Sequence, residues 1–384
     1  MMGRGKHYQH VLLASRECTR CGACLAVCPL LADHGLHPGE VALAIAEDRV
    51  AHETIMAVQR CDLCGLCGVY CKSGIVPSEV MLGARTALHE RERLPVADYE
   101  VALIDRDWNI FSLYRDTYGI DYADLKRDEY ETLFLPGCSL AAFAPELTRA
   151  AHGWLLSQGI RAGFSELCCG EPLRNMGLQD RAERYADYLS KMLHKAGADS
   201  IVAACPGSVT YLTQSLSGTR VVSLYRLMRE AGVRIAVKDR LTVHDSCPDR
   251  RPYGPRIGKD IREMLAGNDF VEMEHHGKES ICCGSGGLVS LVDQHLFLGR
   301  ARRRVAEAEA VEAARVVTAC MTCVYTLSQV SAPRRVSHFL ELLFGIPVNQ
   351  DEILDNLYAM WNGEQGDANQ DRLLGARCFT SWRG

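Results

Sequence analysis

Residues 18–29 read CTRCGACLAVCP, a stretch that holds four cysteines at the spacing C-x2-C-x2-C-x3-C and continues directly into a proline. The same spacing returns in residues 61–71, CDLCGLCGVYC, where Lys72 follows in place of the proline. Two runs of thiols at one fixed spacing are typical of metal ligands and of redox chemistry. The two runs therefore predict that the first part of the chain folds around metal sites.

The composition sets the limits for the rest of the chain. Its 384 residues predict two or three domains, and 47% hydrophobic with 24% charged residues is ordinary for a globular protein. The net charge of −5 offers no basic surface for nucleic acid, so we expect no such partner. No apolar run is long enough to span a bilayer, and the start, MMGRGKHYQH, lacks the apolar stretch of a signal peptide. We therefore expect a cytoplasmic protein, in which the 18 cysteines are not stored as disulfides.

The two cysteine runs resemble the signature of bacterial ferredoxins that carry two [4Fe-4S] cubanes. In that signature the fourth cysteine of each run binds the other cluster. The resemblance assigns one set of ligands to the first cluster, Cys18, Cys21, Cys24 and Cys71, and another to the second, Cys61, Cys64, Cys67 and Cys28. Structural zinc is the alternative, but zinc has no use for a triple C-x2-C-x2-C run.

The segment between the two runs is long, and in residues 37–58 its apolar residues recur mostly at helical offsets. This gap resembles the helical ferredoxin domains of fumarate reductase iron–sulfur subunits and of heterodisulfide reductases. We therefore expect an α-helical ferredoxin domain in residues 1–90. Residues 91–131 are rich in aromatic and acidic residues and are expected to form a connector that packs against its neighbours, with docking of a partner by its aromatic residues as the alternative.

The remainder of the chain contains an internal repeat. LCCGEP at residues 167–172 returns as ICCGSG at 281–286, and VAACPGS at 202–208 returns as VTACMTC at 317–323. Short β-rich runs at 132–135, 201–203, 241–243 and 315–318 precede cysteines and alternate with helical runs. This alternation predicts parallel α/β sheets with the cysteines just past the strand ends, where such sheets place ligand sites. The expected limits are 132–235 and 236–346 for the two copies and 347–384 for a C-terminal tail.

The second copy holds five cysteines, more than zinc or a cubane needs: Cys247, Cys282, Cys283, Cys320 and Cys323. The set resembles the complete CCG motif of heterodisulfide reductase-like proteins, a family that includes iron–sulfur subunits of anaerobic glycerol-3-phosphate dehydrogenase and glycolate oxidase. The resemblance implies a noncubane [4Fe-4S] cluster on these cysteines. Three glycines, Gly284, Gly286 and Gly287, would allow the backbone to approach the cofactor closely. The residues alone predict only a metal site of unknown type.

The first copy departs from that motif. Four cysteines align, Cys138, Cys168, Cys169 and Cys205, but Ser208 occupies the fifth position, and its hydroxyl is a far harder ligand than a thiolate. An altered cluster, a cubane on four cysteines and an empty site all stay open, and we favour an occupied four-cysteine site. The fold class implied by the whole resemblance is an α-helical ferredoxin domain followed by two repeated α/β CCG lobes.

His244 lies three residues before Cys247 and has two interpretations. It is either a buried hydrogen-bonding residue that orients Asp245 and the Cys247 loop, or a proton donor to a substrate thiolate. The first interpretation is the more ordinary one for a histidine beside a strand end.

The resemblance covers residues 18–342 and implies an iron–sulfur oxidoreductase subunit of a multi-subunit complex. No phosphate loop or G-x-G-x-x-G fingerprint follows a predicted strand, so we expect no flavin or NAD on this chain. Electrons would be exchanged with a flavoprotein or ferredoxin-type subunit, and the second CCG cluster would reduce a disulfide. The alternative is a non-catalytic relay from a flavoprotein dehydrogenase to a quinone, a cytochrome or a reductase such as benzoyl-CoA reductase. A membrane cytochrome or quinone-reactive partner would hold the protein at the inner face of a membrane.

Overall fold

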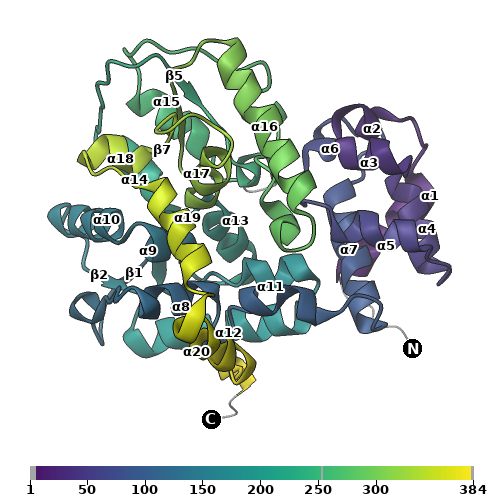
Figure 1. The fold of residues 1–384 in the computed structure, drawn as a ribbon, viewed down its shortest axis with the longest axis horizontal. Helices are drawn as coiled ribbons and strands as arrows, with labels where there is room; N and C mark the ends of the chain where they lie inside the picture. Colours follow the sequence, from purple (N-terminus) through teal and green to yellow (C-terminus); the bar gives the residue numbers. More distant parts are fainter. Residues whose placement is uncertain (1–5, 252–253, 382–384) are drawn as a thin grey trace.

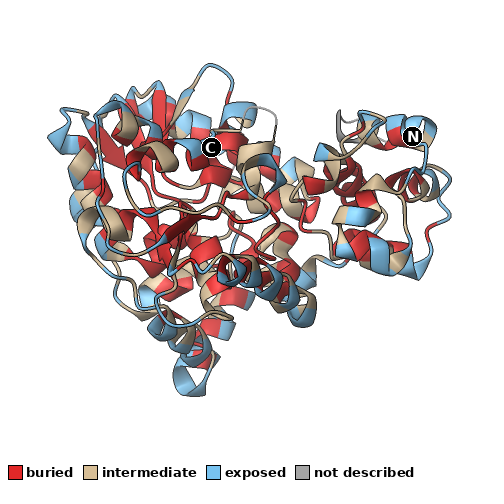
Figure 2. Ribbon diagram, turned by 90° about the horizontal axis from the view of Figure 1, so that it is seen from above, coloured by how far each residue is buried: buried red, intermediate tan, exposed pale blue. Residues whose placement is uncertain are grey.

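A computed structural model describes residues 6–251 and 254–381. The N-terminal part is entirely helical: α1(Lys6–Glu17), α2(Ala23–Val27), α3(Pro29–His34), α4(Pro38–Ala46), α5(His52–Gln59), α6(Leu66–Val69) and α7(Pro77–Glu90). Its small core forms where α1, α4 and α7 pack together around Val11, Val41, Ile45 and Val80. Figure 1 shows this helical unit at one end of the molecule, beside α16, and Figure 2 shows it projecting from a larger body. The helical linkage predicted between the cysteine runs is confirmed by α4 and α5.

Residues 91–131 are packed into the body of the protein. They contain η1(Val96–Ala102), α8(Ile110–Thr117) and η2(Ala123–Leu125). The aromatic side chains of Tyr99, Tyr114 and Tyr122 are each no more than 3% exposed. These three aromatic residues are therefore core residues of the larger body.

The first repeat forms a four-stranded parallel sheet in the order β2-β1-β3-β4. Its strands are β1(Thr132–Leu135), β2(Ala162–Phe164), β3(Ser200–Ala203) and β4(Arg220–Ser223). Its helices are α9(Cys138–Phe143), α10(Pro145–Ser157), α11(Glu171–Met176), α12(Gln179–Ala196), α13(Pro206–Ser215) and α14(Leu224–Glu230).

The second repeat has the same topology in a shorter form. Its parallel sheet has the order β5-β6-β7, from β5(Leu241–Val243), β6(Arg315–Thr318) and β7(Val336–His338). A parallel bridge from Leu241 to Phe270 takes the place that β2 has in the first sheet. The helical elements are η3(Cys247–Arg250), α15(Ile257–Met264), η4(Gly277–Glu279), η5(Gly286–Leu291), α16(Gln294–Ala310), α17(Met321–Ser328) and α18(Phe339–Phe344). The parallel α/β sheets predicted from the repeat are thus confirmed.

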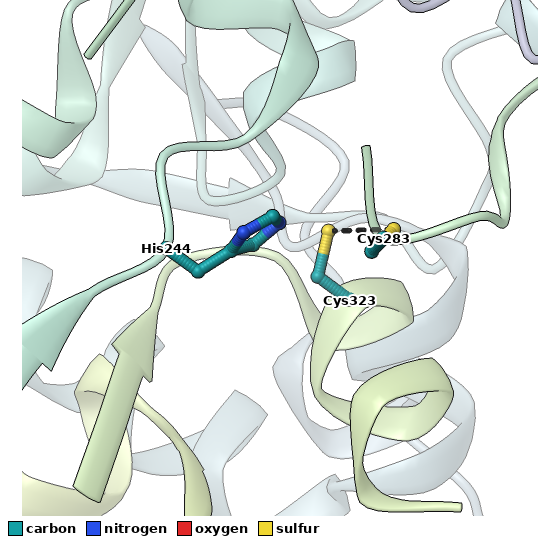
Figure 3. A group of neighbouring side chains, drawn as sticks. All are labelled: His244, Cys283 and Cys323. Atoms are coloured by element: carbon teal, nitrogen blue, oxygen red, sulfur yellow. Dashed lines mark hydrogen bonds between the residues drawn. The ribbon is translucent and has the colours of Figure 1, made fainter. Parts of the chain in front are cut away.

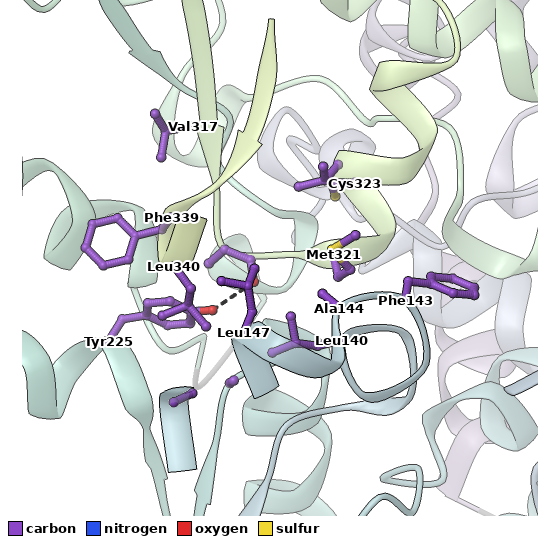
Figure 4. Close-up of a cluster of buried hydrophobic side chains, with 14 of the residues drawn as sticks. Leu140, Phe143, Ala144, Leu147, Tyr225, Val317, Met321, Cys323, Phe339 and Leu340 are labelled. Atoms are coloured by element: carbon purple, nitrogen blue, oxygen red, sulfur yellow. Dashed lines mark hydrogen bonds between the residues drawn. The ribbon is translucent and has the colours of Figure 1, made fainter. Parts of the chain in front are cut away.

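The two repeats share one hydrophobic core. Leu140, Phe143 and Tyr225 from the first repeat lie in the same buried cluster as Met321 and Phe339 from the second (Figure 4). Ser139 and Thr322 also join across the repeats through a 2.9 Å hydroxyl contact. The repeats are therefore two halves of one packed body.

The C-terminal segment completes this body with α19(Gln350–Ala359), α20(Gly363–Leu374) and η6(Phe379–Ser381). It packs on residues 91–131, where the Tyr118 hydroxyl donates to the Asn356 carbonyl at 2.7 Å. Ile353, Met360 and Leu373 enter the shared core. Among the described residues, no helix is both long and apolar enough to cross a membrane.

Candidate metal centres

The structure brings the first predicted set of cubane ligands together at the surface of the helical unit. Cys18, Cys21, Cys24 and Cys71 line one cavity. Cys21 is exposed, and the backbone N–H of Ala23 lowers the pKa of its thiol. The backbone also comes close on the other side, because a Cβ on Gly39 would lie 2.4 Å from Cys18 Cβ. These four thiols could hold a cluster that solvent and a partner can reach.

The second predicted set lies inside the molecule. Cys28, Cys61, Cys64 and Cys67 line a second cavity, whose wall also contains Cys282 from the second repeat. Burial raises the pKa of Cys28 to about 11 and that of Cys61 to about 12. Buried thiols of this kind become thiolates when a metal binds them, so the donor set fits a buried iron–sulfur cluster.

Arg300 and Asp62 form an ion pair beside this second cavity. Arg300 Nη1 lies 2.7 Å from Asp62 Oδ1, and the two side chains are 10% and 4% exposed. Arg300 belongs to α16 of the second repeat, whereas Asp62 belongs to the cysteine run of the helical unit. The pair therefore joins the two parts of the chain at the edge of the cavity.

Arg85 is a second buried link, and it has no carboxylate partner in the described structure. Its Nη1 donates to the carbonyl oxygens of Asn175 and Gly287, at 2.5 and 2.9 Å. Its Nη2 donates to three carbonyl oxygens at 2.8–3.0 Å, those of Val58, Gln59 and Cys61. One fully buried guanidinium thus joins the helical unit to both repeats.

The five cysteines of the second repeat converge at the carboxyl ends of its strands. The sulfurs of Cys247 and Cys282 are 3.7 Å apart, and those of Cys283 and Cys323 are 3.4 Å apart. Cys320 contacts Cys323 through its thiol. Five mostly buried thiols in contact are the donor set expected for an iron–sulfur cluster.

The second repeat also contacts the helical unit directly through sulfur. The Cys282 thiol forms a hydrogen bond with Cys64, and this bond lowers the pKa of Cys64. Cys64 belongs to the buried cubane set and Cys282 to the CCG set, so the two ligand sets touch.

His244 lies beside the same group of sulfurs. A ring nitrogen of His244 and the sulfurs of Cys283 and Cys323 all lie within 4.8 Å of one another (Figure 3). The imidazole is 1% exposed, and burial lowers its pKa. Its Nδ1 accepts a hydrogen bond from Arg304 Nε at 3.0 Å.

The three glycines proposed for cofactor binding differ in what they approach. The backbone N–H of Gly284 donates to Cys282 Sγ at 3.3 Å, so this glycine reaches a proposed ligand. Gly286 and Gly287 instead pack against the helical unit. A Cβ on Gly286 would lie 2.2 Å from the Asp62 carbonyl oxygen, and one on Gly287 would lie 2.1 Å from that of Cys61. The absence of a side chain at these two glycines allows the second repeat to pack closely against the cysteine run.

The first repeat gathers its four cysteines in the same relative place. Cys138 and Cys168 have sulfurs 3.7 Å apart, and the Cys168 thiol also contacts Cys169. Burial raises the pKa of Cys205, and the charges of Cys320 and Cys169 raise it further. Ser208 is 2% exposed, and its backbone N–H donates to Cys205. The four thiols could hold a metal, and they lie next to the second CCG set through Cys205 and Cys320.

Sequence reasoning missed the arginines at these sites. Arg300 and Arg304 lie in the basic stretch RARRR at 300–304, which is typical of an exposed helix face. Helical periodicity could have identified Arg304 as buried. In α16 it falls on the same face as the buried residues Phe297, Ala301 and Ala308. Arg85 is the only charged residue between Val80 and Leu88 of α7, all of which are buried.

Comparison with known protein families agrees with this arrangement. The model of the 4Fe-4S dicluster domain matches residues 14–75, and that of the cysteine-rich CCG domain matches residues 132–212 and 241–328. A subunit of the dihydromethanophenazine:CoB–CoM heterodisulfide reductase of Methanosarcina mazei is 25% identical over 367 residues, which cover 81% of this chain and 88% of that protein.

Two further relatives carry other names. A subunit of the fumarate reductase (CoM/CoB) of Methanothermobacter marburgensis is 22% identical over 338 residues, 80% of this chain and 66% of that protein. The EtfAB:quinone oxidoreductase of Syntrophomonas wolfei is 26% identical over 179 residues, 41% of this chain and 24% of that protein. These relatives are oxidoreductases or subunits of them, which supports a redox role for the chain. The chain thus combines a 4Fe-4S dicluster domain with two cysteine-rich CCG domains, and over four fifths of its length it is similar to heterodisulfide reductase subunits.

Proposed function

We propose that this chain transfers single electrons between two [4Fe-4S] cubanes and a noncubane [4Fe-4S] cluster. The cubanes would be held by the two cysteine sets of the helical unit. The noncubane cluster would be held by the five cysteines of the second repeat, and the four cysteines of the first repeat would hold a further cluster. The chain's own contribution is to hold these sites in a fixed order.

The contact between Cys64 and Cys282 is the observation that carries this proposal. Ligand sulfurs in contact leave no other side chain between the buried cubane site and the CCG site. The Asp62–Arg300 ion pair and the five carbonyl bonds of Arg85 hold this junction together. Electrons would therefore pass from the helical unit to the second repeat without a separate carrier.

The exposed Cys21 site is the place where electrons would enter or leave. A flavoprotein or a ferredoxin-type subunit of a larger complex would dock there. The names of the relatives, subunits of heterodisulfide reductase and of fumarate reductase, support such a complex.

At the second repeat we propose a disulfide as the acceptor. The reaction takes two electrons, supplied one at a time by the reduced flavoprotein or ferredoxin, and two protons, and it converts one disulfide into two thiols. Five thiols in contact and the heterodisulfide reductase relatives support this acceptor.

A relay without its own substrate is the second candidate. Ser208 replaces the fifth cysteine of the first repeat, and one relative is named EtfAB:quinone oxidoreductase. In this case the second repeat would pass electrons on to a quinone, a cytochrome or a partner reductase.

Iron analysis and EPR of the full chain, purified anaerobically, test the electron path. We expect about twelve iron atoms per chain if the first CCG site is empty and about sixteen if it holds four. Cys283→Ala should lose about four iron atoms, keep the cubane signals, and lose electron flow to any acceptor. Cys378→Ala is the matched control, because its thiol contacts Asp105 and Thr380, away from the proposed ligands. Zinc, a colourless protein, or a Cys283→Ala variant with unchanged electron flow would contradict the proposal.

EPR of the oxidised protein separates the two candidates. A spectrum that changes when disulfides or thiols are added supports disulfide reduction by this chain. A spectrum that they leave unchanged removes the enzyme interpretation and leaves the relay.

A further inference from the structure

Arg304 is a fully buried arginine that forms hydrogen bonds with two histidine residues and an ion pair with a glutamate. Its Nε donates to Nδ1 of His244 at 3.0 Å, and its Nη1 donates to the carbonyl oxygen of His275 at 2.7 Å. It also pairs with Glu307, one turn along α16. Partners on both Nε and Nη1 hold the guanidinium in one orientation.

The Arg304 contact determines where His244 carries its proton. A guanidinium has donors only and stays protonated in proteins, so Nδ1 of His244 must be the acceptor. A ring nitrogen that accepts a hydrogen bond carries no proton, so the ring is neutral and holds one proton. That proton lies on Nε2, because Nδ1 is occupied by the hydrogen bond from Arg304.

The proton on Nε2 faces sulfur. Nε2 is buried, and no nitrogen or oxygen atom in residues 6–251 and 254–381 accepts a hydrogen bond from it. The ring points toward Cys283 and Cys323 (Figure 3), and one of its nitrogens lies within 4.8 Å of both sulfurs. A buried donor is costly when it has no acceptor, and a thiolate is an acceptor at this place.

The direction of the Arg304–His244 hydrogen bond also affects whether His244 can bind iron. A histidine that binds a metal through one nitrogen donates the N–H of its other nitrogen to an acceptor. In this protein the other nitrogen of His244 receives a hydrogen bond from Arg304, which is the reverse arrangement. The Arg304 contact therefore disfavours iron binding through Nε2, although His244 lies near the sulfurs.

We propose that Arg304 is a positioning residue that fixes His244 as a hydrogen-bond donor to the Cys283 sulfur and keeps it from binding iron. The inference rests on the proposed function, since it treats Cys283 as a cluster thiolate. Hydrogen bonds to ligand sulfurs tune the reduction potential of an iron–sulfur cluster. Because a donor stabilises the more negative, reduced state, His244 raises the potential of the site at the second repeat.

Potentiometric EPR titration of the full chain, purified anaerobically, tests this role. His244→Leu should move the midpoint of the CCG signal to a more negative potential and leave both cubane midpoints in place. His244→Gln should recover part of the shift, because its side-chain N–H reaches toward the position of Nε2. Arg304→Gln should shift the midpoint in the same direction as His244→Leu, and Arg304→Lys should shift it less, because lysine is also a donor only. Arg302→Gln, an exposed position on the same helix, is the matched control and should change nothing.

Each other outcome overturns the inference in a recognisable way. Loss of iron from the CCG site in His244→Leu, with the cubane signals retained, would make His244 a ligand. Unchanged midpoints in His244→Leu, with all iron retained, would remove the donor role and leave the proposed function intact. Wild-type protein that holds only cubane iron would remove the proposed function and this inference with it. If the Arg304 variants do not fold, the two His244 variants still decide between donor and ligand.

Discussion

At the scale of single residues, Arg85 and Arg304 are the largest fully buried side chains of the described structure. Burying a charge is costly unless hydrogen bonds satisfy it. The two terminal nitrogens of Arg85 donate to carbonyl oxygens alone, and two of these, of Val58 and Gln59, lie at the C-terminal end of α5, where the helix dipole favours a cation. Arg304 directs one donor at a histidine ring. Both arginines act on backbone or side chains next to the cysteines, which explains why the interior tolerates them.

His338 gives a prediction on pH at the same scale. It is fully buried, and burial lowers its pKa from 6.5 to about 4. The unfolded chain therefore binds more protons than the folded chain between about pH 4 and 6.5. The contribution of neutral His338 to the free energy of unfolding is fully present above about pH 6.5 and falls as the pH drops through this range. The expected loss is roughly 3 kcal/mol once the pH lies below about 4, and roughly 2 kcal/mol between about pH 7.5 and about pH 5.

Urea unfolding of the anaerobic protein at about pH 7.5 and about pH 5 measures this loss. The control is His338→Leu, because the first repeat has Leu224 at the equivalent position. The drop in unfolding midpoint between the two pH values should be smaller in the variant. An equal drop in both proteins would show that other groups cause the acid sensitivity.

At the scale of elements, the cysteine loops follow from the strand–helix order. Cys138, Cys205 and Cys320 come two or three residues after β1, β3 and β6, and each lies at or next to the start of a helix. Parallel strands bring their carboxyl ends to one edge, so cysteines far apart in the sequence meet there. The strands predicted at 132–135, 241–243 and 315–318 are confirmed with those bounds, and the strand predicted at 201–203 begins one residue earlier. The alternation of short β-rich runs with amphipathic helices was enough to predict these strands from the sequence.

Gly287→Ala gives a prediction for the element η5. Gly287 has φ +59, and a Cβ would lie 2.1 Å from the Cys61 carbonyl oxygen. The new methyl group must strain the backbone and push the cysteine run away from the second repeat. We expect a loss of about 2 kcal/mol in stability or more, together with slower electron transfer from the cubanes to the CCG site.

Freeze-quench EPR after mixing with a chemical reductant measures that transfer, and urea unfolding measures the stability. Gly299→Ala in α16 is the control, because nothing lies within 4 Å of its Cβ position. In a helix this exchange should stabilise by about 0.5–1 kcal/mol. Equal transfer rates in both variants would show that close packing at Gly287 is not needed.

At the scale of the whole molecule, a small helical unit is joined to a large two-repeat body. The core of the helical unit contains Cys24 among its buried residues, and Cys18, Cys28, Cys61, Cys67 and Cys71 pack against that core. The body has its own extensive cores, to which the connector and the C-terminal helices contribute. We therefore expect the two parts to differ in how far their folding depends on bound metal.

Removal of iron by oxidation and chelation should unfold the helical unit first. Hydrogen exchange should show lost protection in residues 6–90 and retained protection in β1, β3 and β6, because proposed ligands are only a small minority of the buried residues in the cores of the body. Limited proteolysis should cut within the first ninety residues. Loss of protection spread evenly over the chain would contradict separate metal dependence.

The sequence by itself determined which residues could bind metal and which proteins the chain resembles. Cysteine spacing is local in the chain, and the repeat sets the strand–helix order, so both can be read without coordinates. Tertiary structure alone decided that Cys64 meets Cys282, that Arg85 and Arg300 hold the junction, and that Arg304 orients His244. These contacts join segments far apart in the sequence, and their strength depends on burial, which no spacing pattern encodes.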